Sequence, residues 1–160
     1  MLDPYRDDIA IMTDEQQPPP LLTWGYIETI TSAGDHISRI SGYVDGLEAV
    51  RQGLHHLFNT ERYVEYQYYP DVVYRRVRYP LFPNYGVEFD QLIGKSFGYV
   101  EAVIEQLIAD ALTNLDYVVS HKVTSVTLER SDTVHVDLEV LSDYGSLTYG
   151  FNIPLSRGAA

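Results

Sequence analysis

The sequence predicts an α+β fold in which two main helices pack on an antiparallel sheet with a C-terminal three-strand meander. Three observations support this class. In two segments, apolar residues recur every three or four positions, the spacing of a helix with one buried face. Beyond Val118 the apolar period changes to two, the spacing of strands with one covered face. The length of 160 residues fits one domain with a single core.

We expect residues 1–22 to form an extended N-terminal arm. Asp14 to Gln17 and the three prolines Pro18 to Pro20 show no core-forming periodicity, and consecutive prolines favour an extended conformation. Two interpretations stay open: a frayed terminus, or an arm that orders only against a neighbouring subunit. We expect one domain over residues 23–157 and a short tail over residues 158–160.

Two short segments rich in aromatic and β-branched residues, Trp24–Thr31 and Ile37–Val44, predict strands. Asp45 then predicts the start of the first helix, because its side chain suits an N-cap. Glu48 lies three positions later, where its carboxylate can reach back to the Asp45 amide. We expect this helix to end near Asn59. Its apolar stripe consists of Leu47, Val50, Leu54, Leu57 and Phe58.

The next segment predicts a β-hairpin. Tyr63–Tyr69 and Val72–Tyr79 flank Pro70-Asp71, a dipeptide suited to the centre of a type I turn. A proline-rich loop over residues 80–86 follows the hairpin. The sequence therefore predicts a ribbon between the two helices.

The second half of the chain predicts one more helix and the meander. Asp90–Ile93 suggests a helical turn stopped by Gly94, and Ser96 is expected to cap the second helix, which ends near Asn114. Its apolar face consists of Phe97, Val100, Ile104, Leu107, Ile108 and Ala111. Three alternating segments follow, with a turn at residues 143–145. Their apolar residues are Val123, Val126, Leu128, Val134, Val136, Leu138, Val140, Leu147, Tyr149, Phe151 and Ile153.

Composition excludes several classes of protein. A net charge of −12 disfavours nucleic acid as a partner, because phosphates would be repelled. The absence of cysteine excludes disulfides, thiolate metal sites and a cysteine nucleophile. Residues 1–8 lack the features of a signal peptide, and no apolar run approaches the roughly 20 residues of a membrane span. We expect a chain made in the cytoplasm, with no nucleic acid and no membrane as partner.

The sequence indicates no catalytic, cofactor-binding or metal-binding residue. The histidines are His36, His55, His56, His121 and His135. They accompany neither a nucleophile elbow nor metal-ligand spacing, and no phosphate-binding glycine loop is present. Glu61, Glu88 and Asp90 could supply the two acids of a glycosidase. A chain with 23 acidic residues, however, offers such pairs by chance.

The adjacent pair Glu61-Arg62 is a candidate partner-binding site at a helix-to-strand corner. An exposed ion pair would contribute less than about 1 kcal/mol. Alternatively, the planar guanidinium of Arg62 bridges to a carboxylate or to backbone carbonyls of a partner. Both interpretations stay open.

The hairpin is a second candidate partner-binding surface, since tyrosine and arginine are the residues that protein interfaces enrich. Its tyrosines are Tyr63, Tyr66, Tyr68, Tyr69, Tyr74, Tyr79 and Tyr85, interleaved with Arg75, Arg76 and Arg78. Alternation places Tyr74, Arg76 and Arg78 on one face, and Arg75 and Val77 on the other. Such a ribbon on an acidic protein predicts docking to an acidic partner. The alternative is a solvated ribbon with a few buried rings.

Four short motifs occur in a fixed order, at residues 42–52, 59–63, 84–88 and 92–95. They read GYVDGLEAVRQ, NTERY, NYGVE and LIGK. With this order and spacing, the chain resembles the small baseplate wedge, or sheath-initiator, family of contractile phage tails in its PBSX-like prophage version. That superfamily includes the T4 wedge subunit nearest the tail tube and a type VI secretion baseplate component. The resemblance covers about residues 39–143.

The resemblance implies a structural protein of the virion tail baseplate, present in six copies around the base of the tail tube. Its implied partners are the larger wedge proteins and the first-ring sheath subunits, with tube or hub proteins as further candidates. The family is thought to start sheath polymerisation, which physically is the addition of a strand to an open sheet edge. The meander over residues 123–153 could provide that edge.

The resemblance also bears on particular residues. In the family a Glu-Arg pair follows the first helix, which favours partner contact for Glu61 and Arg62. Between Tyr69 and Phe82 the chain departs from the family pattern, so we interpret the hairpin over residues 63–80 as an insertion. Some members of the superfamily have carried a lysozyme label, so a baseplate-associated murein hydrolase using paired carboxylates is the alternative function.

Overall fold

A computed structural model of the protein describes residues 22–30, 36–69 and 72–156. It confirms the predicted α+β class, with helices and antiparallel sheets in the expected order. The predicted arm over residues 1–22 lies outside the described residues, except for Leu22. The predicted turn at Pro70-Asp71 and the tail over residues 158–160 also lie outside them.

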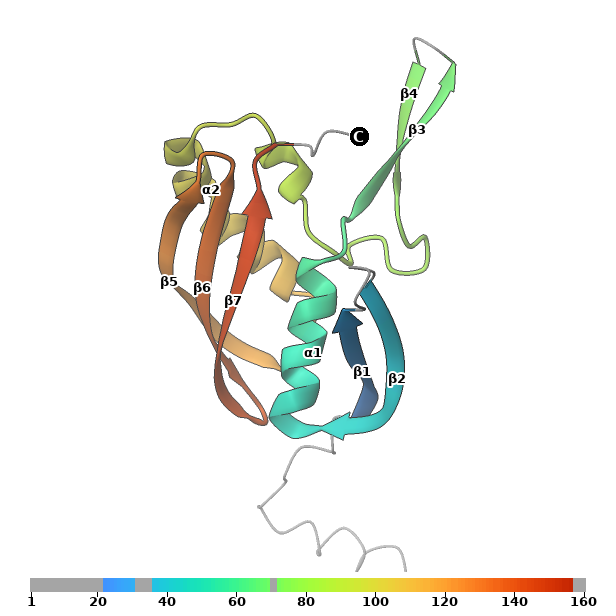
Figure 1. Cartoon of the computed structure of the whole chain (residues 1–160), viewed down its shortest axis with the longest axis vertical. Coiled ribbons are helices and arrows are strands. Elements are labelled where there is room, and N and C mark those ends of the chain that lie inside the picture. Colours follow the sequence, from blue (N-terminus) through green and yellow to red (C-terminus); the bar gives the residue numbers. More distant parts are fainter. Residues whose placement is uncertain (1–21, 31–35, 70–71, 157–160) are drawn as a thin grey trace, which may run out of the picture.

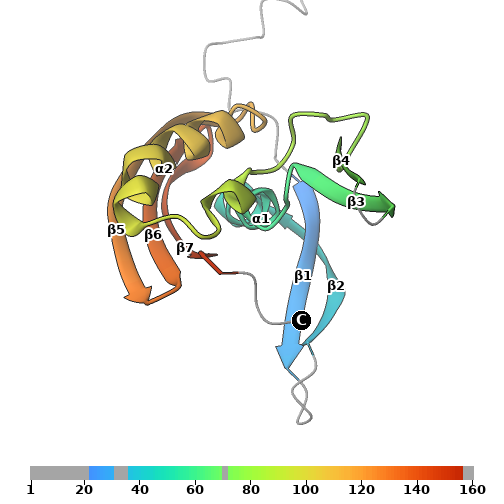
Figure 2. The same ribbon diagram turned by 90° about the horizontal axis from the view of Figure 1, so that it is seen from above.

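The C-terminal meander is confirmed and forms the largest sheet. β5 (Val118–Arg130), β6 (Thr133–Ser142) and β7 (Gly145–Pro154) lie in this order and pair antiparallel. The pairing of β6 with β7 runs without a register shift, whereas the pairing of β5 with β6 shifts at three places. The sheet curves, and both helices lie on its concave side (Figures 1 and 2).

The first helix, α1 (Gly46–Phe58), begins after Asp45 and ends before Asn59, as predicted. The predicted capping box is wrong, because the Asp45 side chain accepts no cap hydrogen bond. Glu48 lies 3.7 Å from Arg51 instead, one turn further along the helix. The predicted stripe is confirmed except at Leu47, which is 40% exposed.

The second helix, α2 (Phe97–Leu112), is capped as predicted, with the Tyr99 N–H donating to Ser96 Oγ at 3.4 Å. A 3-10 turn, η1 (Phe89–Leu92), precedes it, close to the helical turn that the sequence predicts. Among the described residues, no helix combines the length and apolar character that crossing a bilayer requires.

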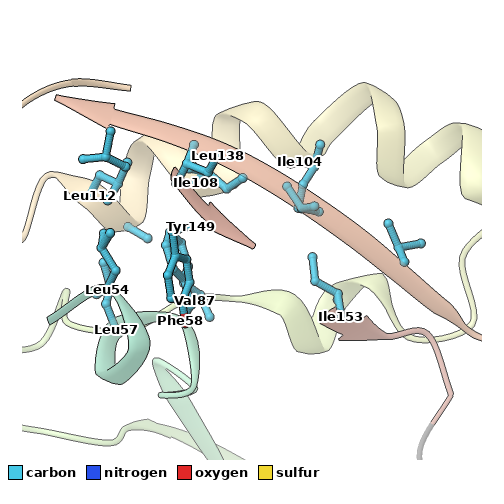
Figure 3. Packing of buried hydrophobic residues seen from close by; sticks show 14 of the residues in the cluster. Leu54, Leu57, Phe58, Val87, Ile104, Ile108, Leu112, Leu138, Tyr149 and Ile153 are labelled. Carbon is cyan, nitrogen blue, oxygen red and sulfur yellow. The ribbon is translucent and has the colours of Figure 1, made fainter. Parts of the chain in front are cut away.

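One core joins both helices to the meander (Figure 3). Phe58 at the end of α1 stacks on Phe151 with ring centroids 4.5 Å apart, and Tyr149 lies beside it. Burial of each large apolar side chain stabilises the fold by roughly 1.5–3 kcal/mol. The fully buried members include Leu54, Leu57, Leu92, Ile104, Ile108, Val134, Val136, Leu138 and Ile153.

Two small sheets flank this body. β1 (Leu22–Ile30) and β2 (His36–Asp45) pair with each other beside α1. β3 (Tyr63–Tyr69) and β4 (Val72–Val77) form the predicted hairpin, although β4 ends two residues earlier than expected. Figure 1 shows the hairpin standing away from the body, on the side opposite β5.

Candidate partner-binding surface

The corner that follows α1 is fixed by backbone pairing to the segment before η1. The Val87 N–H donates to Thr60 O, and the Arg62 N–H donates to Val87 O, both at 2.9 Å. Gly86 has a φ of +104°, and a Cβ atom there would lie 2.6 Å from Thr60 O. Only glycine tolerates both conditions. This pairing places Glu61 and Arg62 at the base of the hairpin.

Arg62 binds within its own chain. Its Nη1 donates to Glu88 Oε1 at 3.0 Å, and its Nη2 donates to Gly86 O at 3.2 Å. Its side chain is only 14% exposed, and its buried Nε has no hydrogen-bond partner in the described part of the chain. The guanidinium thus donates hydrogen bonds to a carboxylate and a carbonyl of its own chain. Contact of this corner with a partner stays a prediction, which falls mainly on Glu61.

Arg75 ties the hairpin to the body. Its Nη2 lies 3.0 Å from Asp90 Oδ2 and 3.8 Å from Glu88 Oε2. Its guanidinium carbon lies 4.2 Å from the centre of the Tyr63 ring, a cation–π geometry. These contacts of Arg75 therefore orient the hairpin relative to the body.

Arg78 follows β4 and closes the base of the hairpin. Its N–H donates to Arg62 O at 2.8 Å, and its Nε donates to Glu61 O at 3.1 Å. Its Nη2 lies 3.7 Å from Glu61 Oε2, and the side chains of Arg78 and Glu61 are 39% and 58% exposed. An ion pair this exposed contributes less than about 1 kcal/mol, so its charges stay accessible to a partner.

Tyr74 and Arg76 point away from the body. Because Arg75 reaches Asp90, strand alternation turns its neighbours to the other face. Tyr74 and Arg76 are both exposed. The three arginines of the predicted basic ribbon therefore differ in their surroundings. Carboxylates of the chain pair with Arg75 and Arg78, whereas Arg76 points outward.

Tyr85 lies against the core rather than on the surface of the hairpin. Burial raises the pKa of its hydroxyl above the ordinary value of 10.0, and the nearby Tyr79 adds to the effect. The Tyr79 and Tyr85 rings meet edge to face with centroids 6.1 Å apart. Tyr85 thus anchors the loop that leads from β4 back to the body.

Comparison with known protein families shows to which family this chain is similar. A family model described as contractile injection system sheath initiator matches residues 31–145. The chain belongs to this family. The match spans α1, the hairpin and α2, and it ends where β7 begins. No curated protein and no solved structure matches the chain.

Membership assigns the sheath initiator a structural role in starting a contractile sheath. It also places the sheath initiator in the tail baseplate, in contact with sheath and baseplate components. The surface described above, comprising Glu61, Tyr74, Arg76 and Arg78, is its candidate for such contact.

The three acids considered for glycoside hydrolysis lie in unsuitable surroundings. Glu88 and Asp90 each face an arginine at 3.0 Å, and Glu61 faces Arg78. A glycosidase instead needs one acid kept protonated, typically in an apolar pocket. This arrangement and the structural role of the family both argue against the hydrolase alternative.

An open groove of about 610 Å³ lies between the base of the hairpin and the end of β7. Its walls combine apolar side chains with three carboxylates. The residues that line the groove are Glu61, Tyr63, Val64, Glu65, Asp90, Ile93, Pro154 and Ser156. In the part of the chain that the structure describes, no group of three or more histidine or acidic residues could hold a metal ion.

The sequence did not reveal two features of this surface. The partners of Arg62 and Arg75 are Glu88 and Asp90, and no local pattern links an arginine to an acid 26 or 15 positions away. The exposure of Leu81 and Phe82 was also missed. Their position between Pro80 and Pro83 was the available signal, since prolines mark a loop at the surface.

Proposed function

We propose that the sheath initiator links the larger wedge proteins to the first sheath ring, with six copies around the tail tube, and starts the sheath by accepting a strand at the edge of β5. Family membership supports the sheath-starting role. The position of β5 supports the choice of edge. The wedge proteins and the PBSX-like version of the family come from the resemblance of the four sequence motifs.

The meander has two outer strands, and they differ in what lies beside them. α1 flanks β7, whereas β5 lies at the outer margin of the molecule in both views (Figures 1 and 2). β5 is also the longest described strand, with 13 residues. An outer strand presents unpaired backbone donors and acceptors, which an incoming strand can use.

The irregular pairing of β5 limits where a strand can add. Its register shifts between residues 118 and 120, 123 and 125, and 128 and 130. Bulges of this kind blunt an edge against unwanted pairing. Between these shifts, residues 120–123 and residues 125–128 each pair in an unbroken register. In the second stretch two adjacent residues, Thr127 and Leu128, are both exposed. This second stretch is the proposed template for the sheath strand.

The hairpin supports the other half of the proposal. It projects from the side of the molecule opposite β5 (Figure 1). A strand added to β5 would therefore not cover Glu61, Tyr74 and Arg76, which could contact a wedge protein. One small domain would then bridge two components without competition between their surfaces.

Paired proline substitutions test the β5 edge. Adjacent residues in a strand direct their N–H groups to opposite sides, so one of Thr127 and Leu128 donates to β6 and the other points outward. Thr127→Pro and Leu128→Pro each remove one donor. The outward position is the one whose variant keeps the wild-type melting temperature, because an edge tolerates proline there.

The tolerated variant is expected to enter the baseplate normally but to leave most tubes without sheath. The other variant serves as the folding control, since it should melt earlier. Normal sheath on particles that carry the folded variant would contradict strand addition at β5.

A further inference from the structure

The loop between β4 and Val87 presents an apolar knob, defined here as Leu81 and Phe82. Their side chains are 88% and 69% exposed, the two highest values among the large hydrophobic residues that the structure describes. They are consecutive in the sequence, so a partner can contact both at one place. Exposed apolar residues that lie together, unlike single ones, are a feature of interaction sites.

The backbone of this loop is held in a fixed shape. The Phe82 N–H donates to Tyr79 O, and the Tyr85 N–H donates to Phe82 O, both at 3.0 Å. These bonds form two successive turns. Pro80 and Pro83 lie within them and restrict the backbone further.

Both ends of the loop are attached to the rest of the chain. The ring of Tyr79 packs on Tyr85, and Tyr85 itself packs against the core. Near the same end, Asn114 Nδ2 donates to Asn84 O at 2.9 Å and ties the loop to the segment after α2. A preformed loop loses little conformational freedom on binding, which favours affinity. The fold thus holds Leu81 and Phe82 in position while leaving them outside its own core.

The sequence around the knob is basic, although Arg75 and Arg78 are paired with carboxylates of the same chain. Residues 72–86 contain three arginines and no acidic residue, whereas the chain carries a net charge of −12. Arg76 is exposed, and Arg78 is part of an exposed ion pair. An exposed arginine and an exposed ion pair close in sequence to an apolar anchor complement a pocket with apolar walls and carboxylates at its rim.

We propose that Leu81 and Phe82 insert into an apolar pocket, bordered by carboxylates, on a neighbouring baseplate protein. This insertion holds the sheath initiator in the baseplate. It rests on the proposed function, in which the hairpin side faces the wedge proteins. It assigns the anchoring to residues outside the four sequence motifs and leaves β5 free for the sheath.

A second copy of the chain is the competing occupant. The groove at the base of the hairpin has matching chemistry, since Tyr63, Val64 and Ile93 line it together with carboxylates. Photocrosslinking from the knob separates the two occupants. In intact particles, Phe82→benzoylphenylalanine is expected to give adducts with one wedge protein, at a peptide containing aspartate or glutamate. Adducts to a second copy near Ile93, or none above those of a control probe at Leu141, would overturn the proposal.

Substitution of the knob tests its contribution. Leu81→Ser with Phe82→Ser should leave the melting temperature of the isolated chain unchanged, because both side chains are exposed. Loss of a central anchor should lower the amount of the chain per particle by roughly tenfold or more. Leu141→Ser is the matched control, being 43% exposed on the meander. An unchanged amount of the double variant in particles would refute the anchor.

The variants of the two proposals are expected to give different particles. Substitution of the knob should remove the chain from the baseplate. Proline in the outward position of β5 should leave the chain in the baseplate without sheath. Particles that contain the knob variant at the normal level and still form sheath would contradict the anchor alone.

Discussion

The ion pair between Arg62 and Glu88 is expected to contribute measurably to the stability of the fold. The two side chains are 14% and 24% exposed, and their atoms lie 3.0 Å apart. Glu88→Gln keeps the shape of the side chain but removes its charge, while the bond from Arg62 to Gly86 O remains. Hydrogen bonds to charged groups contribute roughly 1.5–3 kcal/mol. The longer contact of Glu88 with the half-exposed Arg75 adds less than about 1 kcal/mol.

We therefore expect Glu88→Gln to lower the free energy of unfolding by about 2 kcal/mol. For a chain of this length, that loss corresponds to a fall in melting temperature of roughly 4–8 °C. Urea unfolding followed by circular dichroism measures the change directly. Glu48→Gln is the control, because its pair with Arg51 is exposed and 3.7 Å long.

A double-mutant cycle with Arg62→Leu isolates the coupling energy between the two side chains. The reasoning would be refuted if Glu88→Gln cost no more than Glu48→Gln. A coupling energy near zero would refute it equally. In either case, the backbone pairing of Thr60 and Val87 alone would fix the corner.

Three further predictions concern other parts of the fold. Gly86→Ala should lower the melting temperature, because its Cβ would lie 2.6 Å from Thr60 O; an unchanged value by calorimetry would contradict the geometry. The bond to Asn152 raises the pKa of His135 above 6.5, so its contribution to stability is full below that pH and is lost as the pH rises through the folded pKa. NMR titration should show a lower His135 pKa in Asn152→Ala, and an equal pKa would disprove the cause. Leu54→Ala should cost about 2–5 kcal/mol in urea unfolding, and a loss under about 1 kcal/mol would contradict its full burial.

The regular elements were predictable because their signals are local. The apolar stripe of α1 and the alternation in the meander each lie within one stretch of sequence, and burial follows the stripe except at Leu47 and the alternation in β6. In β5 the alternation is wrong at Leu128, which is 47% exposed. The cap at Ser96 was found for the same reason, since it depends on residues three positions apart. The capping box at Asp45 failed because a suitable spacing permits a bond without requiring it.

The contacts of the candidate surface were less predictable because they join distant positions. The sequence offers many carboxylates and carbonyls that could accept a hydrogen bond from Arg62. The backbone pairing of Thr60 with Val87 is what brings Glu88 next to it. Strand alternation correctly placed Arg75 on the face opposite Arg76, but it did not say what each face of the hairpin would meet. In the folded chain Arg75 pairs with Asp90, a partner that the sequence alone does not indicate.

Cryo-electron microscopy of the intact particle tests the central claim most directly. The account predicts this chain between the wedge proteins and the first sheath ring, with a sheath strand hydrogen-bonded along residues 125–128 of β5. The opposite side of the chain, including Glu61 and the knob, should contact a wedge protein. A chain that lies elsewhere in the particle, or a β5 edge left unpaired beside an assembled sheath, would contradict the account.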